Sequence, residues 1–98
     1  MAKQIICANK PSGNLHNPHE TVTDYGWHDD ITNTNGIWDR QTMVDWVNAG
    51  NRAYVGNNGK VSECAVRGIP PRQFLQTHAD GYWNDNIVNL PNCIVSNI

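Results

Sequence analysis

The chain has 98 residues, a length that fits one modest core, and we expect residues 1–98 to fold as a single domain. The net charge of −2 is close to neutral and argues against nucleic acid as a partner. No apolar run approaches the roughly 20 residues of a membrane-spanning helix, and the N-terminus lacks the apolar region of a signal peptide, so we expect a soluble, cytoplasmic protein that contacts no membrane.

The N-terminal part of the chain predicts two paired strands. Residues 3–8 are short and apolar and precede a turn-rich stretch at 9–18, which is typical of a buried strand. In residues 20–27 a face of Thr, Tyr and Trp side chains alternates with a more polar face, and this period of two predicts a second strand. We expect the two strands to pair with each other.

A turn and a helix are predicted next. The Asn-Thr-Asn-Gly sequence at 33–36 indicates a turn, because Asn-Gly accepts the positive backbone angles of tight turns. Asp39 is a suitable N-cap for a helix, and Gly50 can end that helix in a left-handed conformation. Three apolar residues recur at helical spacing and predict the face that packs on the sheet: Met43, Trp46 and Val47.

A hairpin and one further strand complete the expected elements. Residues 52–56 and 60–67 flank an Asn-Asn-Gly sequence, a pattern typical of a β-hairpin with a tight turn. Residues 73–77 predict one more strand, and residues 80–93 predict an ordered loop. The resulting order, ββαβββ, predicts an α+β fold in which one helix covers a small, mostly antiparallel sheet. We expect strong curvature, since so short a sheet must cover both its faces and its edges.

The cysteines give no indication of a disulfide or of catalysis. Cys7, Cys64 and Cys93 are odd in number and lack a close Cys-x-x-Cys spacing, so we expect reduced thiols with a structural role. No nucleophile motif, phosphate-binding glycine loop or dinucleotide fingerprint occurs. The chain is therefore expected not to be an enzyme and to use no cofactor.

The charged residues are unevenly distributed along the chain. Residues 20–45 hold six acidic side chains and one base, Arg40. Four bases then follow against the single acid Glu63, namely Arg52, Lys60, Arg67 and Arg72. This distribution predicts a fold with an acidic and a basic side, or an ordinary surface on which the two groups neutralise one another.

Several short sequences occur in an order that resembles a known family. In chain order they are Ile5-Ile6, Asn17-Pro18-His19-Glu20, Trp38 with Val44 to Val47, Tyr54-Val55, Phe74-Leu75-Gln76-Thr77, Asp80-Gly81 and Leu90-Pro91-Asn92-Cys93. Their shared order resembles the small bacterial family catalogued as domain of unknown function 3892, over nearly the whole chain. That family carries no agreed catalytic residues, so the resemblance implies no site.

A metal site is the alternative to a purely binding role. His16, His19 and His28 supply imidazoles, and neighbouring carboxylates could complete a zinc site in a metal-binding protein or a metal-dependent hydrolase. However, His16 and His19 lie in a proline-containing loop, and no helical His-Glu-x-x-His fixes their positions. The competing interpretation is that His19 and Glu20 form hydrogen bonds that shape the turn into the second strand.

The leading hypothesis is a contact patch. Trp27 and Trp83, bordered by Asp29, Asp30 and Asp85, predict an acidic and aromatic surface, because tryptophan buries much area in interfaces and keeps a polar handle. The alternative is that these tryptophans anchor loops and are partly buried. The patch would make the chain a small non-enzymatic binding module whose partner is another protein.

A narrower hypothesis is an inhibitor from a phage or mobile element that masks a basic surface on a host defence complex. The oligomeric state is left open.

Overall fold

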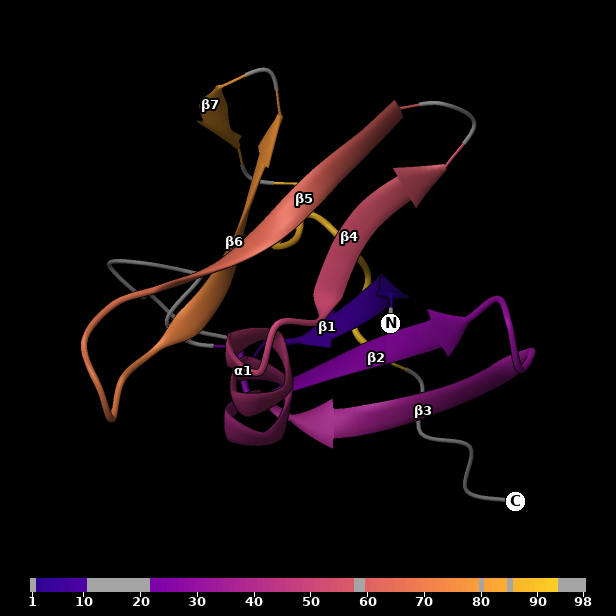
Figure 1. Cartoon of the computed structure of the whole chain (residues 1–98), viewed down its shortest axis with the longest axis horizontal. Coiled ribbons are helices and arrows are strands. Elements are labelled where there is room, and N and C mark those ends of the chain that lie inside the picture. The colour runs from indigo at the N-terminus through magenta and orange to yellow at the C-terminus, as the bar shows by residue number, and fades with distance from the viewer. Residues whose placement is uncertain (1, 11–21, 58–59, 80, 85, 94–98) are drawn as a thin grey trace.

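The computed structural model describes residues 2–10, 22–57, 60–79, 81–84 and 86–93 (Figure 1). Its elements in chain order are β1 (Ala2–Asn9), β2 (Asp24–Asp29), β3 (Thr34–Asp39), α1 (Arg40–Asn48), β4 (Arg52–Asn57), β5 (Lys60–Arg67), β6 (Phe74–Ala79) and β7 (Tyr82–Asn84). Among these residues, no helix has the length and apolar character needed to cross a membrane.

The described strands form one seven-stranded sheet in the order β3-β2-β1-β4-β5-β6-β7. Neighbouring strands are antiparallel except β1 and β4, which run parallel. Parallel neighbours need a long connection, and here β2, β3 and α1 supply it before the chain returns beside β1. The predicted α+β class, with one helix and a mostly antiparallel sheet, is confirmed.

The expected strong curvature is wrong. The sheet is open, and its edge strands β3 and β7 lie at opposite ends of the molecule (Figure 1). β4 pairs with β1 only as far as Gln4, and farther along β1 the C-terminal tail takes its place: the Ala8 amide donates to the Pro91 carbonyl over 3.0 Å. Ile87, from the same tail, is buried in the core. The tail therefore covers part of β1 and of the core, and the sheet does not have to curl to bury them.

Two strands formed where none was predicted. The turn expected at 33–36 lies earlier, because the Asp29 carboxylate accepts the amides of Ile31 and Thr32 and closes the chain there. Gly36 is then free to lie in β3, opposite Trp27. A Cβ on Gly36 would lie 2.4 Å from Cζ2 of the Trp27 indole, so this glycine makes room for a ring rather than a turn. The second new strand, β7, lies within residues 80–93, where an ordered loop was expected.

Helix α1 begins and ends as predicted. The Asp39 carboxylate accepts the Thr42 amide over 2.7 Å, and Gly50 has a φ of 101° just beyond the helix. Met43 is buried as expected, but Val44 is the other fully buried helix residue. Trp46 and Val47 are half-buried and pack against the rim of the core. The buried face is thus shifted by one residue from the predicted stripe.

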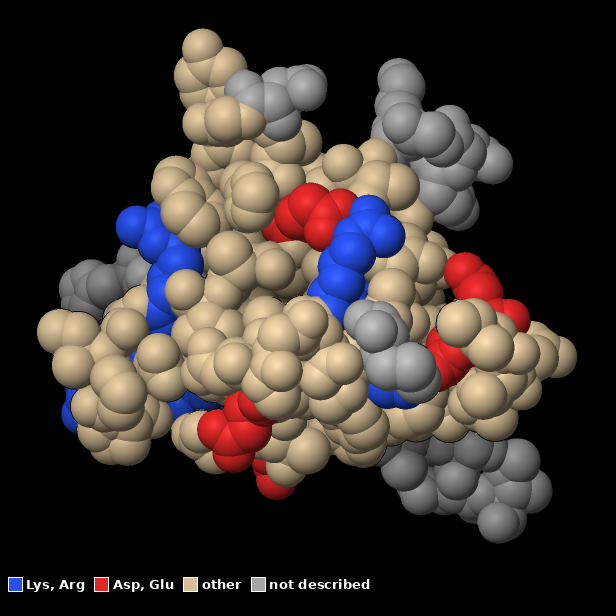
Figure 2. Space-filling view, viewed as in Figure 1, with Lys and Arg blue, Asp and Glu red and all other residues tan. Residues whose placement is uncertain are grey.

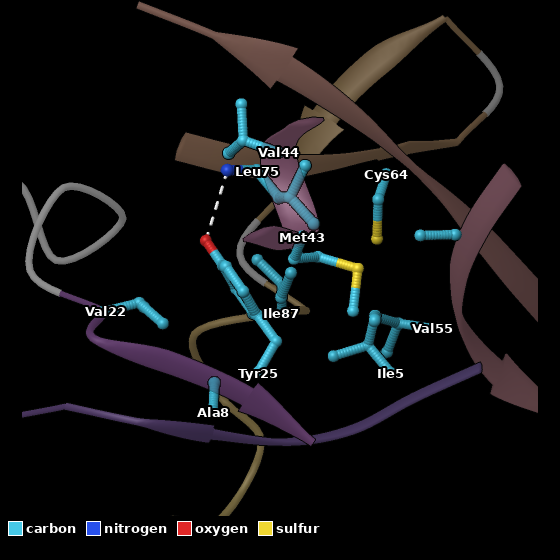
Figure 3. Close-up of a cluster of buried hydrophobic side chains, with 11 residues drawn as sticks. Ile5, Ala8, Val22, Tyr25, Met43, Val44, Val55, Cys64, Leu75 and Ile87 are labelled. Carbon is cyan, nitrogen blue, oxygen red and sulfur yellow. Dashed lines mark hydrogen bonds between the residues drawn. The ribbon is translucent and has the colours of Figure 1, made fainter. Parts of the chain in front are cut away.

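Tyr25 connects the two ends of the sheet through the core (Figure 3). Its ring comes from β2 and is fully buried, and its hydroxyl oxygen accepts the backbone amide of Leu75 in β6 over 3.1 Å. Burial raises the pKa of Tyr25 to about 12, so the phenol stays neutral. Met43 and Val44 of α1 pack over the same cluster.

Replacing Tyr25 with Phe tests this connection. Tyr25→Phe leaves the buried Leu75 amide without its acceptor, and we expect a loss of about 1–3 kcal/mol in the free energy of unfolding, measured with urea. Tyr54→Phe is the matched control, because the Tyr54 hydroxyl bonds to the exposed Asp30 carboxylate and its loss should cost less than about 1 kcal/mol. Equal losses in the two variants would contradict the assigned role of Tyr25.

Candidate functional site

Trp27 belongs to a closed cluster rather than to an exposed patch. Its ring centroid lies 5.0 Å from that of Trp38, which in turn lies 5.8 Å from that of Trp46. The Lys3 ammonium lies over this group, 3.8 Å from the Trp27 centroid and 5.3 and 5.5 Å from the other two. We call Lys3, Asp29 and these three tryptophans the lysine box. The cation that contacts the three rings is the Lys3 ammonium of the chain itself.

Asp29 neutralises the lysine of this box. The Lys3 ammonium donates to Oδ2 of Asp29 over 3.1 Å, and the two side chains are only 9% and 3% exposed. The Thr32 amide and then Lys3 hold the pKa of the Asp29 carboxyl below its usual range. The Asp29 carboxylate is therefore paired within the protein and is not available to a partner.

Asp30 and His28 lie at the exposed rim next to the box. His28 Nε2 is 3.1 Å from Oδ1 of Asp30, and the Tyr54 hydroxyl donates to Oδ2 of the same carboxylate over 3.2 Å. The other ring nitrogen of His28 contacts the Asn35 side-chain oxygen. His16 and His19 lie outside the described residues, and within the described ones no three His, Cys, Asp or Glu side chains converge on a metal position. The metal site stays a prediction.

Trp83 lies at the other end of the sheet, on edge strand β7. Four strands, β1, β4, β5 and β6, separate β7 from the β2 strand of Trp27. At roughly 4.8 Å per strand step, the two tryptophans are about 24 Å apart across the sheet. The structure therefore does not bring Trp27 and Trp83 together in one patch. Asp85 lies outside the described residues.

The surroundings of Trp83 form an aromatic and cationic surface. The Arg67 guanidinium lies 4.1 Å from the Trp83 ring centroid, and the His78 ring meets the indole edge-on at 5.2 Å. Tyr82 and Trp83 are 77% and 48% exposed. We call Arg67, His78 and Trp83 the β7 surface. Tyr82 is the neighbouring residue of the strand and points to the opposite face of the sheet. Only Trp83 of these residues was predicted to bind a partner. A two-residue Asp-Gly connection between Ala79 and Tyr82 is nevertheless typical of a hairpin and would have placed Trp83 opposite His78.

The β7 surface carries the cation Arg67 and lies next to the acid Glu63, which is opposite His78 on β5. Arg67 donates to the Gln76 side chain over 2.8 Å, and no described carboxylate pairs with Arg67 or Arg72. Arg52, on β4, is instead neutralised by Glu63. Figure 2 shows basic atoms over the β5–β6 hairpin and acidic atoms at several places, including the middle of the view beside a basic side chain and the far end of β2 and β3. Charges of both signs are thus interspersed on this face, and the acidic and basic sides stay a prediction.

A disulfide joins Cys7 and Cys93, which are 86 residues apart, so the expectation of three reduced thiols is wrong. The pairing depends on the tail lying beside β1, which no local pattern in the sequence indicates. Gly26, opposite Cys7 on β2, makes the room: a Cβ there would lie 2.1 Å from the Cys7 sulfur. Cys64 is the free cysteine, and burial raises the pKa of its thiol. The cytoplasmic location stays a prediction.

A family model described as protein of unknown function (DUF3892) matches residues 4–91, from β1 to the tail. The chain belongs to this family. The resemblance noted in the sequence is thereby confirmed, and it transfers no catalytic residue to this DUF3892 protein. No curated protein and no solved structure matches the chain.

The fit between Gly26 and the disulfide of this DUF3892 protein can be tested by counting thiols. Gly26→Ala puts a methyl group where the Cys7 and Cys93 sulfurs lie, so we expect three titratable thiols in the denatured variant against one in the parent. Gly50→Ala is the control for a destabilising methyl group, because its φ of 101° strains any side chain while nothing lies within 4 Å of its Cβ position, and it should retain one thiol. A single thiol in Gly26→Ala would show that the disulfide does not need this glycine.

The acid dependence of stability tests the lysine box. The folded pKa of Asp29 is depressed, so its contribution is present above the unfolded pKa of about 3.9 and is lost as the pH falls through the folded pKa. We expect Asp29→Asn to be less stable than the parent near pH 7 and the difference to shrink as the pH falls below about 3.9. Urea unfolding across this range measures it. A difference that does not change with pH would contradict the ion pair.

Proposed function

We propose that this DUF3892 protein is a non-enzymatic binding module that holds a partner protein against its β7 surface. The observation that carries the proposal is the exposure of Trp83 directly beside Arg67. Trp, Tyr and Arg are the residues that supply most of the binding energy at protein interfaces. A tryptophan of this kind contributes by burying its ring when the partner excludes water.

Charge indicates the chemistry of the partner. The Arg67 guanidinium is held by the Trp83 ring and by Gln76, and it lacks a described carboxylate. Such a preorganised fork can take a carboxylate in two parallel hydrogen bonds at a small cost in side-chain entropy. We therefore propose a partner that presents an acidic side chain next to an apolar one.

The narrower and the alternative hypotheses stay predictions. An inhibitor that masks a basic surface needs free acidic groups. Asp29, one of the three acids of the expected contact patch, is neutralised by Lys3. With Arg67 stacked on Trp83, the β7 surface favours an acidic partner over a basic one. A metal-dependent hydrolase would need His16 and His19 to approach His28, which itself already contacts Asp30 and Asn35.

Retention of the partner by variants of the β7 surface tests the proposal. Tagged protein is incubated with native lysate, and bound proteins are quantified by mass spectrometry. We expect Trp83→Ala to retain the partner at least about tenfold less, because truncating a central tryptophan costs about 2 kcal/mol or more. Arg67→Lys should also weaken retention, since lysine keeps the charge but loses the stacked fork.

The matched control is Ile31→Ala, an exposed apolar residue in the turn that follows β2. This variant should retain the partner as the parent does. A partner retained equally by Trp83→Ala and by the parent would overturn the proposed surface.

A further inference from the structure

Strand β3 is an open edge of the sheet. It pairs with β2 over six consecutive residues, from Asp24↔Asp39 to Asp29↔Thr34, without a bulge. Its other side has no strand neighbour among the described residues. Natural edge strands are usually protected by lysine, proline, a bulge or short length, and β3 has none of these. The opposite edge, β7, has only three residues and so offers little backbone for pairing.

An apolar groove reaches this edge on the face of the sheet opposite α1. Ile37 of β3 is 45% exposed, and together with Ile6 it borders a cavity of about 370 Å³. The Cys7–Cys93 disulfide and Pro91 line the same cavity. Ile37, Gly26 and Cys7 are paired across β3, β2 and β1, so the apolar strip runs straight from the disulfide to the open edge.

We infer that this edge binds a second copy of the chain, with the two β3 strands antiparallel about a two-fold axis at Ile37. An axis perpendicular to the sheet keeps each face on its own side, so only residues of the same face can be opposite each other. If the axis passes beside Ile37, each residue of β3 is paired with a residue that points to the same face. Ile37 then faces Ile37 of the second copy, and Asn35 faces Asp39 of the second copy.

The side chains that become opposite each other favour a second copy of the chain in this register. The exposed isoleucine packs against an identical side chain, and Asp39, whose carboxylate caps α1, lies opposite the uncharged Asn35 rather than another charge. The two grooves also join into one apolar strip across the axis. Pairing centred on Gly36 instead would place Ile37 opposite Asn35 and leave its apolar surface unmatched. The β7 surface lies at the far end of each sheet, so the dimer leaves both copies of it open.

Sedimentation equilibrium tests the inference on the intact protein. A single strand pair buries a small interface, and we expect a dissociation constant between about 1 μM and 1 mM. The parent mass should rise with concentration from 11.0 kDa to twice that value. Ile37→Lys places a charge at the axis and should stay monomeric. Ile69→Lys, at an isoleucine that is 82% exposed in the β5–β6 connection, should dimerise as the parent does.

Amide hydrogen exchange of the parent gives a second measurement that needs no variant. The outward-pointing amides of β3 should exchange more slowly at high concentration than at low concentration, while those of β7 should not change. A parent that stays monomeric up to about 1 mM would overturn the inference, and an extended peptide from another protein would then be the candidate for this edge. Dimerisation that Ile37→Lys leaves intact would overturn it too, because the contact would lie elsewhere.

Discussion

The parallel pairing of β1 with β4 is the constraint on which the rest of the structure depends. It joins two antiparallel groups, β3-β2-β1 and β4-β5-β6-β7, through only three residue pairs. Because the strands are parallel, the chain must return across the sheet between them, and α1 does so directly after its Asp39 cap. The helix brings Met43 and Val44 over the junction, and the Tyr25 hydroxyl reaches from β2 to the Leu75 amide of β6. Packing across the core thus compensates for a short strand pairing.

The same junction explains the disulfide and the placement of the candidate surfaces. β4 leaves β1 after Gln4, and the tail fills the opening, which brings Cys93 to Cys7. The sheet can then remain open, with β3 and β7 as its edge strands among the described residues. One edge carries the groove that we assign to a second copy of the chain, and the other carries Trp83 and Arg67. A dimer through the first edge would present two β7 surfaces to partners, which raises the effective affinity for a bivalent target.

Local signals in the sequence predicted much of this fold, and long-range contacts explain the rest. The cap at Asp39, the end at Gly50 and the hairpin of β4 and β5 rest on neighbours in sequence and formed as expected. Strand β3 was missed because Gly36 has the chemistry of a turn, whereas its role is to receive the Trp27 ring. Of the candidate site, Trp83 was predicted but its neighbours were not. Lys3 and Asp29 are 26 residues apart and meet only when β1 pairs with β2, so the acidic patch could not be distinguished from an internal ion pair.

The central claim is that the two groups of strands form one cooperative unit through β1, β4 and the shared core. Native-state amide hydrogen exchange under increasing urea tests it most directly, because it reports an opening free energy for each protected amide. We predict that protected amides in β1, β2, β4, β5 and β6 converge on one global opening free energy. Opening of β4 to β7 at a lower urea concentration, while amides of β1 to β3 stay protected, would contradict the account.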